Sequence, residues 1–235
     1  DCLITINDED YNLALNKKFK AKEIRKIHGV GVNLSKFYPV SDQEKRNLRR
    51  KHGFNENDFI LIYPAELNTN KNQLLLINAV NLIKDKVLSL RLILAGNWPL
   101  FDHYKKRVTE LNLSNNIILA GYRKDIDELL QLSDVSVASS IREGLPVNIM
   151  EAMACGLPIV ATTNRGHREI IKHGQSGYLV DLEKTREFAD SIYKLYLDKK
   201  RREEMGEYNL KIVDKYSVEN VCQELETIYK IYLDD

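Results

Sequence analysis

The stretch REGLPVNIMEAMACGLPIVAT, residues 142–162, predicts a loop, a helix and a buried strand in direct succession. Its Gly-Leu-Pro is not tolerated inside a helix, so the helix must begin there. The segment 147–155 is helix-patterned, and the apolar run LPIVAT that follows is typical of a strand. Two acidic residues flank the helix start, with Glu143 just before it and Glu151 in its first turns.

The same alternation of apolar runs and helix-patterned segments continues on both sides of this stretch. Strands are expected at 58–65, 90–96, 116–121, 134–140, 157–162 and 177–180. Helices are expected near 71–86, 99–112, 125–133, 147–155 and 167–173. Because the strands are apolar at consecutive positions, we expect both of their faces to be buried, as in parallel sheets. The pattern predicts an α/β fold with a doubly wound, Rossmann-like parallel sheet.

We expect four parts along the chain, one of which is a linker. Residues 1–26 are expected to belong to another domain, beginning with one strand and one helix, and 27–40 form a glycine-containing linker. Residues 41–212 form the Rossmann-like domain, whose last part is helical with a break near Gly206. After a second break at Tyr216-Ser217, the helix within 213–235 has an apolar face, for which the N-terminal segment is one candidate docking place. The chain starts in mid-fold without Met, so we expect it to be the back part of a longer protein.

Composition narrows the function classes. The formal net charge is +1, from 35 basic and 34 acidic residues, so no cationic field favours nucleic acid as a partner. The three scattered cysteines indicate reduced thiols. No signal peptide is recognised, and no apolar run approaches the roughly 20 residues of a membrane span. We expect a cytoplasmic protein. The basic runs 44–53 and 199–204 either touch anionic lipid at the inner membrane face or are solvated helix faces, and their acidic neighbours favour the second.

The loop before the helix is a candidate anion site. In an open α/β sheet, ligands bind beyond the carboxyl ends of the strands, where 139–143 are expected to lie. Gly144 lets the backbone approach a ligand closely. Pro146 suits the first helical position, because its missing N–H would be unpaired anyway. The free amides of Val147 and Asn148 then point outward at the positive end of the helix dipole, where phosphate binds well.

The two acidic residues beside this site favour sugar hydroxyls over phosphate as their own partners. A nucleotide sugar offers hydroxyls on both sides of its diphosphate, and carboxylates accept strong hydrogen bonds. Glu143 and Glu151 therefore suit the two sugars, whereas a glycosidase pair would act across one bond. A structural role at the helix start remains the alternative. Lys71, at another helix start, is unfavourable there without an anion, so it suits the same diphosphate, although a solvated lysine is also consistent.

Together these segments resemble the donor half of a GT-B glycosyltransferase of the retaining group called family 4, or group 1, in its capsular and exopolysaccharide branch. The resemblance covers nearly the whole chain. It is carried by GVGVNLSKF (29–37), AELNTNKNQ (65–73), LILAGN (92–97), IILAGYRKDIDELLQLSDVSVASS (117–140), residues 142–162 and GHREIIKHGQSGYLV (166–180). DCLITINDEDY (1–11) resembles the last strand and helix of the family's N-terminal acceptor domain.

The resemblance implies a role for each matched residue. Glu143 would hold hydroxyls of the transferred hexose, Lys71 would stabilise the leaving diphosphate, and Glu151 would bind the ribose. The remaining donor contacts would come from Gly144, from the backbone amides of Leu145, Val147 and Asn148, and from Tyr122 and Arg123 beside the nucleobase.

The resemblance also implies the reaction. A hexose or N-acetylhexosamine would pass with retention from a nucleotide sugar, with UDP favoured, to a glycan or lipid-linked acceptor. No cofactor and no metal are expected. Asp125 and Asp127 formally match an Asp-x-Asp metal motif, but helix capping is the better interpretation, and the five histidines have no ligand spacing.

Several departures from the family pattern bear on this assignment. Glu66 stands where many relatives carry arginine, and Arg165 or Arg168 is a candidate replacement for that cation. Pro146 removes one amide, and Asn97-Trp98 alters the base pocket.

Because most of the N-terminal domain that the resemblance implies lies outside this sequence, we expect the chain alone to be inactive. A non-catalytic nucleotide-sugar binding module and a GT-B-like sugar-nucleotide epimerase remain alternatives, the latter requiring an acid/base set that the sequence does not display.

Overall fold

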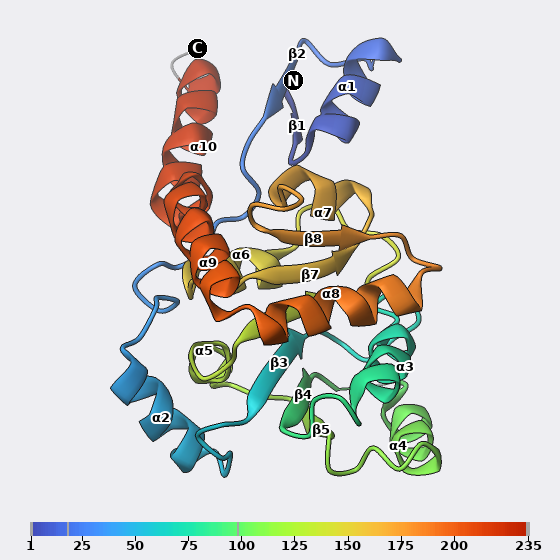
Figure 1. The fold of residues 1–235 in the computed structure, drawn as a ribbon. Helices are drawn as coiled ribbons and strands as arrows, with labels where there is room; N and C mark the ends of the chain where they lie inside the picture. The colour runs from blue at the N-terminus through green and yellow to red at the C-terminus, as the bar shows by residue number, and fades with distance from the viewer. Residues whose placement is uncertain (1, 18, 98, 234–235) are drawn as a thin grey trace.

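A six-stranded sheet forms the body of the protein, and the N-terminal segment stands at one end of it (Figure 1). The computed structural model describes residues 2–17, 19–97 and 99–233, so the expectation for Trp98 lies outside the described residues. The sheet is parallel, with strand order β5-β4-β3-β6-β7-β8. Its strands are β3 (Phe59–Pro64), β4 (Leu90–Ala95), β5 (Ile117–Gly121), β6 (Val135–Ala138), β7 (Ile159–Thr162) and β8 (Gly177–Val180). Each coincides with an expected apolar run, which confirms the doubly wound parallel sheet.

The strand order reverses between β3 and β6, at the centre of the sheet. From β3 the chain winds outward through β4 to β5, and from β6 it winds the opposite way through β7 to β8. At such a switch point the two following loops leave toward opposite faces, which opens a crevice at the carboxyl ends of the strands. The hydroxyls of Tyr63, on β3, and Ser140, just after β6, lie 2.6 Å apart and join the two strand ends.

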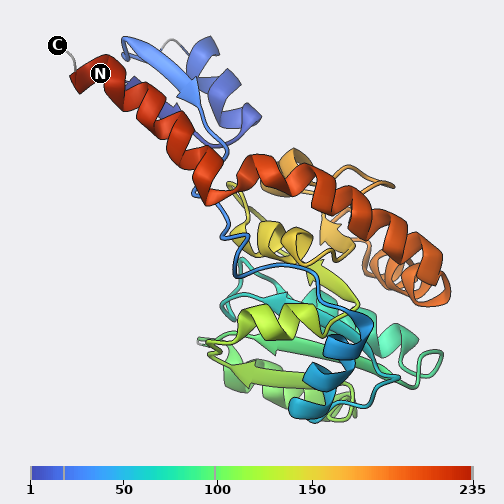
Figure 2. The same cartoon turned by 90° about the vertical axis from the view of Figure 1, so that its left-hand side faces the viewer.

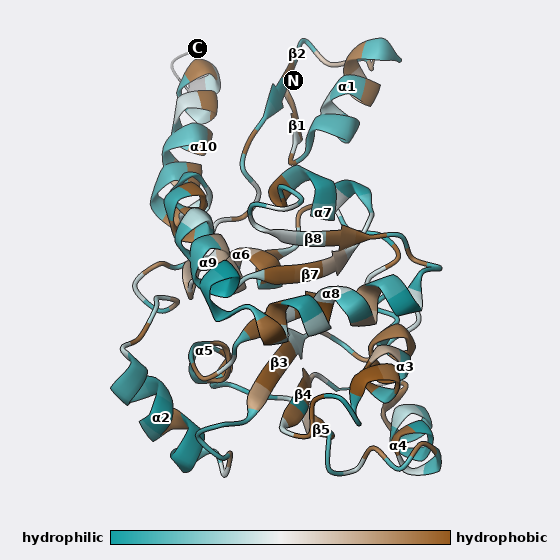
Figure 3. Cartoon of the chain, viewed as in Figure 1, coloured by the Kyte–Doolittle hydropathy of each residue, from teal (hydrophilic) through white to brown (hydrophobic). Residues whose placement is uncertain are grey.

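Helices cover both faces of the sheet because its strands are apolar on both faces. On one face α3 (Gln73–Ile83) packs against α4 (Phe101–Glu110) and α8 (Thr185–Leu197). On the other, α6 (Val147–Ala154) packs against α5 (Ile126–Gln131) and α9 (Lys199–Val213). Figure 3 shows apolar strands inside, a largely apolar α3, and polar turns on α4, α8 and α9. Among the described residues, no helix is both long and apolar enough to span a membrane.

The first basic run lies in α2 (Asp42–Lys51), which a Ser41–Glu44 capping box starts. Two of its cations point inward: Lys45 and Arg49 contact Asp134 at 2.9 and 2.7 Å. These ion pairs fix α2 to the amino end of β6. Burial acts to raise the pKa of Asp134, but the charges of Lys45 and Arg49 outweigh it, and the pKa is lowered. Part of this run therefore faces inward and is not the solvated helix face that the sequence favoured, and lipid contact stays an untested alternative.

The N-terminal segment contains a second strand that the sequence did not predict. β1 (Cys2–Thr5), α1 (Asp8–Asn16) and β2 (Glu23–Lys26) form a parallel β-α-β unit. β2 was missed because its sequence, EIRK, is mostly charged. The long α10 (Val218–Leu233) lies along this unit in Figure 2 and buries Val221 and Ile228 against it.

The expected helix break near Gly206 is wrong. α9 runs through this residue without interruption, and the break falls earlier, at Asp198. Gly206 serves packing instead: a Cβ there would lie 2.2 Å from the carbonyl oxygen of Gly156, just after α6. The second expected break is confirmed, since a short 3-10 turn, η1 (Asp214–Tyr216), and the extended Ser217 separate α9 from α10.

We predict that Gly206→Ala destabilises the protein although alanine is the better helix former. The propensity gain is about 1 kcal/mol, whereas forcing α9 away from Gly156 costs about 2–3 kcal/mol. Urea denaturation would show a lower midpoint for this variant. Glu207→Ala, at an exposed position of the same helix, is the control, and equal stability of the two variants would contradict the packing role.

Candidate functional site

Two loops meet at the switch point of the sheet. One follows β3 and spans residues 65–72, and the other follows β6 and spans 139–146. Asn70 joins them: its carbonyl oxygen accepts from the Ile141 amide at 2.8 Å, and its side chain bonds both backbone groups of Arg142. The expectation that Lys71 serves the same diphosphate as the Glu143 loop requires this adjacency, and the structure shows the adjacency.

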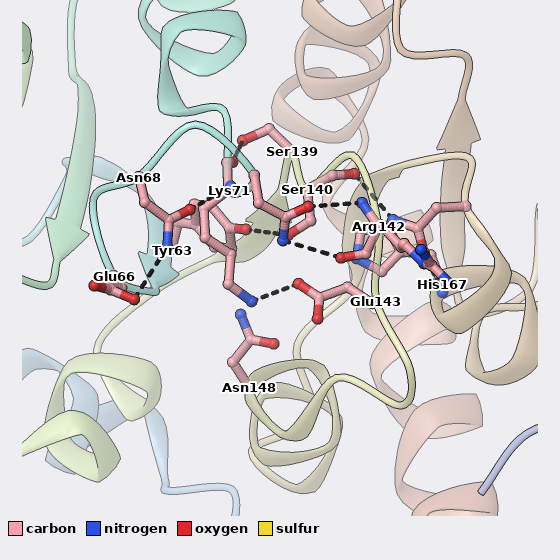
Figure 4. A network of polar contacts seen from close by, with 12 residues as sticks. Tyr63, Glu66, Asn68, Lys71, Ser139, Ser140, Arg142, Glu143, Asn148 and His167 are labelled. Carbon is pink, nitrogen blue, oxygen red and sulfur yellow. Dashed lines mark hydrogen bonds and ion pairs between the residues drawn. The ribbon is translucent and has the colours of Figure 1, made fainter. Parts of the chain in front are cut away.

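Lys71 and Glu143 form an ion pair with 2.5 Å between Nζ and Oε1. Figure 4 shows the two side chains pointing toward each other across the space between the loops. Their exposed side-chain fractions are 23% and 13%, so water screens the pair only in part. Asn68 and Ser139 hold the Lys71 backbone, through bonds of 2.9 and 2.7 Å. The arrangement places one cation and one carboxylate in contact at the switch point.

The start of α6 lies beside this pair. The helix begins at Val147 with Pro146 as its N-cap, so the expectation that Pro146 is the first helical residue is wrong by one position. Proline fits the cap because its backbone is extended there, with ψ 109°. The first amides of a helix have no intrahelical acceptor, so those of Val147 and Asn148 remain available to an anion. The Asn148 side chain donates to the Pro64 carbonyl at 3.0 Å and fixes α6 to the end of β3.

Leu145 and Gly144 pack against the linker and the N-terminal segment, respectively. Leu145 is buried, and its Cδ2 lies 2.6 Å from the position that a Cβ on Gly29 would take, so the linker packs under the loop. Gly144 has an ordinary backbone conformation, and a Cβ there would meet only Ile6, at 3.4 Å. Its expected close approach to a ligand remains a prediction.

Glu151 lies in the second turn of α6, in surroundings different from those of Glu143. Burial raises the pKa of its carboxyl to about 7; Lys36 opposes the shift and Asp127 adds to it. The carboxyl is thus ready to exchange a proton near neutral pH, and a partner that donates hydrogen bonds would favour its charged form. Ribose hydroxyls are partners of this kind.

Tyr122 and Arg123 directly follow β5, the edge strand of the sheet. They line a cavity of about 380 Å³ together with Glu66, Gly96 and Asn97, among others. Tyr122 is 73% exposed, which leaves its ring free to stack on a flat ligand. Arg123 pairs with Asp125. The Asp125 carboxylate therefore does not cap α5, and the capping that the sequence predicted for this residue is wrong. A larger cavity, about 510 Å³, lies at the opposite end of the strands around Asp134, where Lys45 and Arg49 already pair with that carboxylate.

The two candidate replacement cations contact the N-terminal segment. Arg165, the first residue of α7 (Arg165–Ile170), pairs with Asp10 at 2.5 Å and donates from Nε to the carbonyl of Glu143 at 3.0 Å. Arg168 pairs with Glu9 at 3.4 Å, and both of these side chains are more than half exposed. Neither observation shows a guanidinium directed at the diphosphate position.

His167 is fully buried behind the same loop. Its Nδ1 lies 2.6 Å from the Thr162 carbonyl, and burial lowers its pKa to about 4. The ring is therefore neutral at physiological pH, with Nδ1 donating. Its Nε2 is buried and has no hydrogen-bond partner within the residues described.

Sequence spacing did not reveal the grouping of His52, Asp125 and Glu128, whose ligand atoms lie within 4.8 Å of one another. Lys51 contacts Glu128 at 2.6 Å, and Arg123 pairs with Asp125. Both carboxylates are thus already neutralised by cations, and the grouping is an ion-pair cluster that joins α2 to α5.

Comparisons with known proteins show what this chain is similar to. Residues 44–212 match the family model described as "Glycosyl transferases group 1". The chain is 47% identical to "Putative glycosyltransferase EpsD" of Bacillus subtilis (strain 168), over 100% of this chain and 61% of that protein. It is 28% identical to the UDP-Gal:alpha-D-GlcNAc-diphosphoundecaprenol alpha-1,3-galactosyltransferase of Escherichia coli, over 99% and 60%. Anabaena HepE, solved in complex with UDP, has a similar fold, with a TM-score of 0.87 and 23% identity over 97% and 63%. The chain thus spans about 60% of the length of these relatives.

We predict that Glu151→Gln stabilises the ligand-free protein at pH 8 and has little effect at pH 5. Because the folded-state pKa of Glu151 is raised from 4.5 to about 7, wild-type stability falls as pH rises through this window. The gain at pH 8 is at most about 3 kcal/mol, and solvent at the partly exposed carboxyl reduces it.

Urea denaturation at the two pH values measures this difference. Glu128→Gln is the control of opposite sign, because Lys51 and His52 lower the pKa of Glu128 and its charged form stabilises the fold. A Glu151→Gln effect of equal size at both pH values would contradict the shift.

Proposed function

Because this chain belongs to the group 1 glycosyl transferases, we propose that it carries the donor site of a retaining sugar transferase. The observation that supports this most is the Lys71–Glu143 ion pair at the switch point, beside the free amides of α6. The donor would be a UDP-linked hexose or N-acetylhexosamine. UDP is favoured because HepE was solved with UDP and the E. coli relative is named for UDP-Gal.

In this proposal the donor separates the ion pair. Lys71 turns to the diphosphate, whose charge the amides of Val147 and Asn148 also meet. When the bond between the anomeric carbon and the diphosphate oxygen breaks, negative charge develops on that oxygen, and Lys71 stabilises it. The acceptor oxygen bonds to the anomeric carbon on the same face, and its proton passes to the leaving diphosphate. No protein nucleophile and no metal takes part in this scheme.

The released Glu143 carboxylate accepts hydrogen bonds from hydroxyls of the sugar, and Glu151 accepts them from the ribose. Holding both ends of the donor fixes the anomeric carbon for attack, and orientation of this kind is a large part of what an enzyme supplies. The nucleobase would occupy the cavity beside Tyr122 and Arg123.

We further propose that the acceptor is a glycan or a lipid-linked sugar in surface polysaccharide synthesis, handled on the cytoplasmic side of the membrane. Two relatives are named for diphosphoundecaprenol substrates, which are lipid-linked. Three expectations from the sequence remain predictions. They are that residues 1–26 belong to an acceptor domain, that the chain divides into four parts, and that the isolated chain is inactive.

Thermal-shift measurements with UDP, GDP and ADP test the donor assignment. A ligand that binds only the folded state adds about 2.7 kcal/mol of stability at a concentration of 100 times its Kd. We expect UDP to raise the Tm most. A chain that none of the three nucleotides stabilises would contradict the proposed function.

Two substitutions separate the roles in the ion pair. We expect Lys71→Met to weaken UDP binding by about 10- to 100-fold, since a charge-assisted contact to phosphate contributes about 1.5–3 kcal/mol. Glu143→Gln should not weaken UDP binding, because the ion pair that UDP has to separate is already gone, but it should remove the additional affinity for a UDP-sugar. Titration calorimetry measures both, with Lys106→Met, at a 79% exposed side chain of α4, as the control. Equal losses for UDP and UDP-sugar in Glu143→Gln would remove its assigned role.

A further inference from the structure

We propose that Arg165 is a positioning residue for Glu143, and that Asp10 of the N-terminal segment holds Arg165 in place. This rests on the proposed function, in which Glu143 grips the transferred sugar. Arg165 touches no donor atom in this account. It fixes the backbone from which the Glu143 side chain reaches the sugar.

One guanidinium joins two distant parts of the chain. Nε of Arg165 donates to the Glu143 carbonyl at 3.0 Å, and Nη1 contacts Oδ1 of Asp10 at 2.5 Å. The planar group holds its donors at fixed angles, so an acid bound on one edge orients the donor on the other. The Arg165 side chain is only 20% exposed, so water competes weakly for it.

Asp10 is itself held in place. The side chain of the fully buried Asn7 accepts from the Asp10 amide at 2.8 Å and donates to its Oδ2, also at 2.8 Å. The same Asn7 amide group lies 3.5 Å from the Gly144 carbonyl. The turn between β1 and α1 therefore lies directly behind the loop that contains Glu143.

The loop has little room to move on this side. A Cβ at Gly166 would lie 2.7 Å from Cβ of Glu143 and 2.8 Å from the carbonyl oxygen of Gly144, so only glycine allows α7 to come this close. On the opposite side the Glu143 carboxylate contacts Lys71. When Lys71 turns to the diphosphate, the contacts with α7 are what still hold Glu143. A misplacement of about 1 Å at such a group can cost 100-fold in rate.

Other contacts already attach the N-terminal segment to α7, so Arg165 is not needed for that attachment alone. Arg168 pairs with Glu9 at 3.4 Å, Lys26 pairs with Glu169 at 3.1 Å, and the Asp8 amide donates to Glu169 at 3.0 Å. None of these three contacts includes the loop 143–144. Arg165 differs from them by reaching the Glu143 carbonyl.

The test compares the affinities of the 235-residue chain for UDP and for a UDP-sugar by titration calorimetry. The sugar is whichever of UDP-glucose, UDP-galactose and UDP-N-acetylglucosamine binds wild type most tightly. Arg165→Met removes the guanidinium but keeps the chain length. We expect it to lower the preference for UDP-sugar over UDP by about tenfold, with UDP affinity within about twofold of wild type.

Arg168→Met is the matched control, since it removes an arginine of the same helix that also pairs with α1, and its preference should equal that of wild type. Asp10→Asn should reduce the preference in the same direction by a smaller factor, and it tests the proposal even if Arg165→Met does not fold. A wild-type preference retained in a folded Arg165→Met or in Asp10→Asn would overturn the positioning role. Wild type that binds no uridine nucleotide would instead contradict the proposed function.

Discussion

The ion pair between Lys71 and Glu143 is the contact on which the account of this site depends. It joins loops that are 72 residues apart in sequence, and it can form only because β3 and β6 are neighbours at the reversal of strand order. In the ligand-free protein each partner neutralises the other in a partly buried place. A donor that offers an anion to the lysine and hydroxyls to the carboxylate replaces one set of contacts with another, so neither charge is left unpaired.

The surroundings of the pair prepare it for this exchange. α6 presents free amides beside it because Pro146 ends the loop and starts the helix. Glu151 lies further along the same helix, and burial raises the pKa of its carboxyl to about 7. Its charged form therefore lowers the stability of the ligand-free protein, and a ligand that donates hydrogen bonds to it would offset this loss. The buried, neutral His167 and the glycine at position 166 close the back of the loop. Binding groups and structural groups thus lie on opposite sides of the same short segment.

The sequence predicted the six strands of the main sheet because each is a continuous apolar run. It also placed Lys71 and Glu143 at one site, because strand ends share one edge of a parallel sheet, but it did not predict the ion pair between them. Sequence patterns did not predict features that depend on contacts between residues far apart in the chain. Gly206 was interpreted as a helix break, yet it packs against Gly156. β2 is charged, and its pairing with β1 decides its conformation. The bond from Arg165 to Asp10 joins residues 155 positions apart, and no local pattern indicates it.

A crystal structure of the chain with its preferred UDP-sugar tests the central claim most directly. The account predicts that Nζ of Lys71 has left Glu143 and lies about 3 Å from a diphosphate oxygen, with Glu143 accepting from a hydroxyl of the sugar. The amides of Val147 and Asn148 would point at the same diphosphate. A complex in which the Lys71–Glu143 pair stays intact while the nucleotide binds elsewhere, such as the cavity around Asp134, would contradict it.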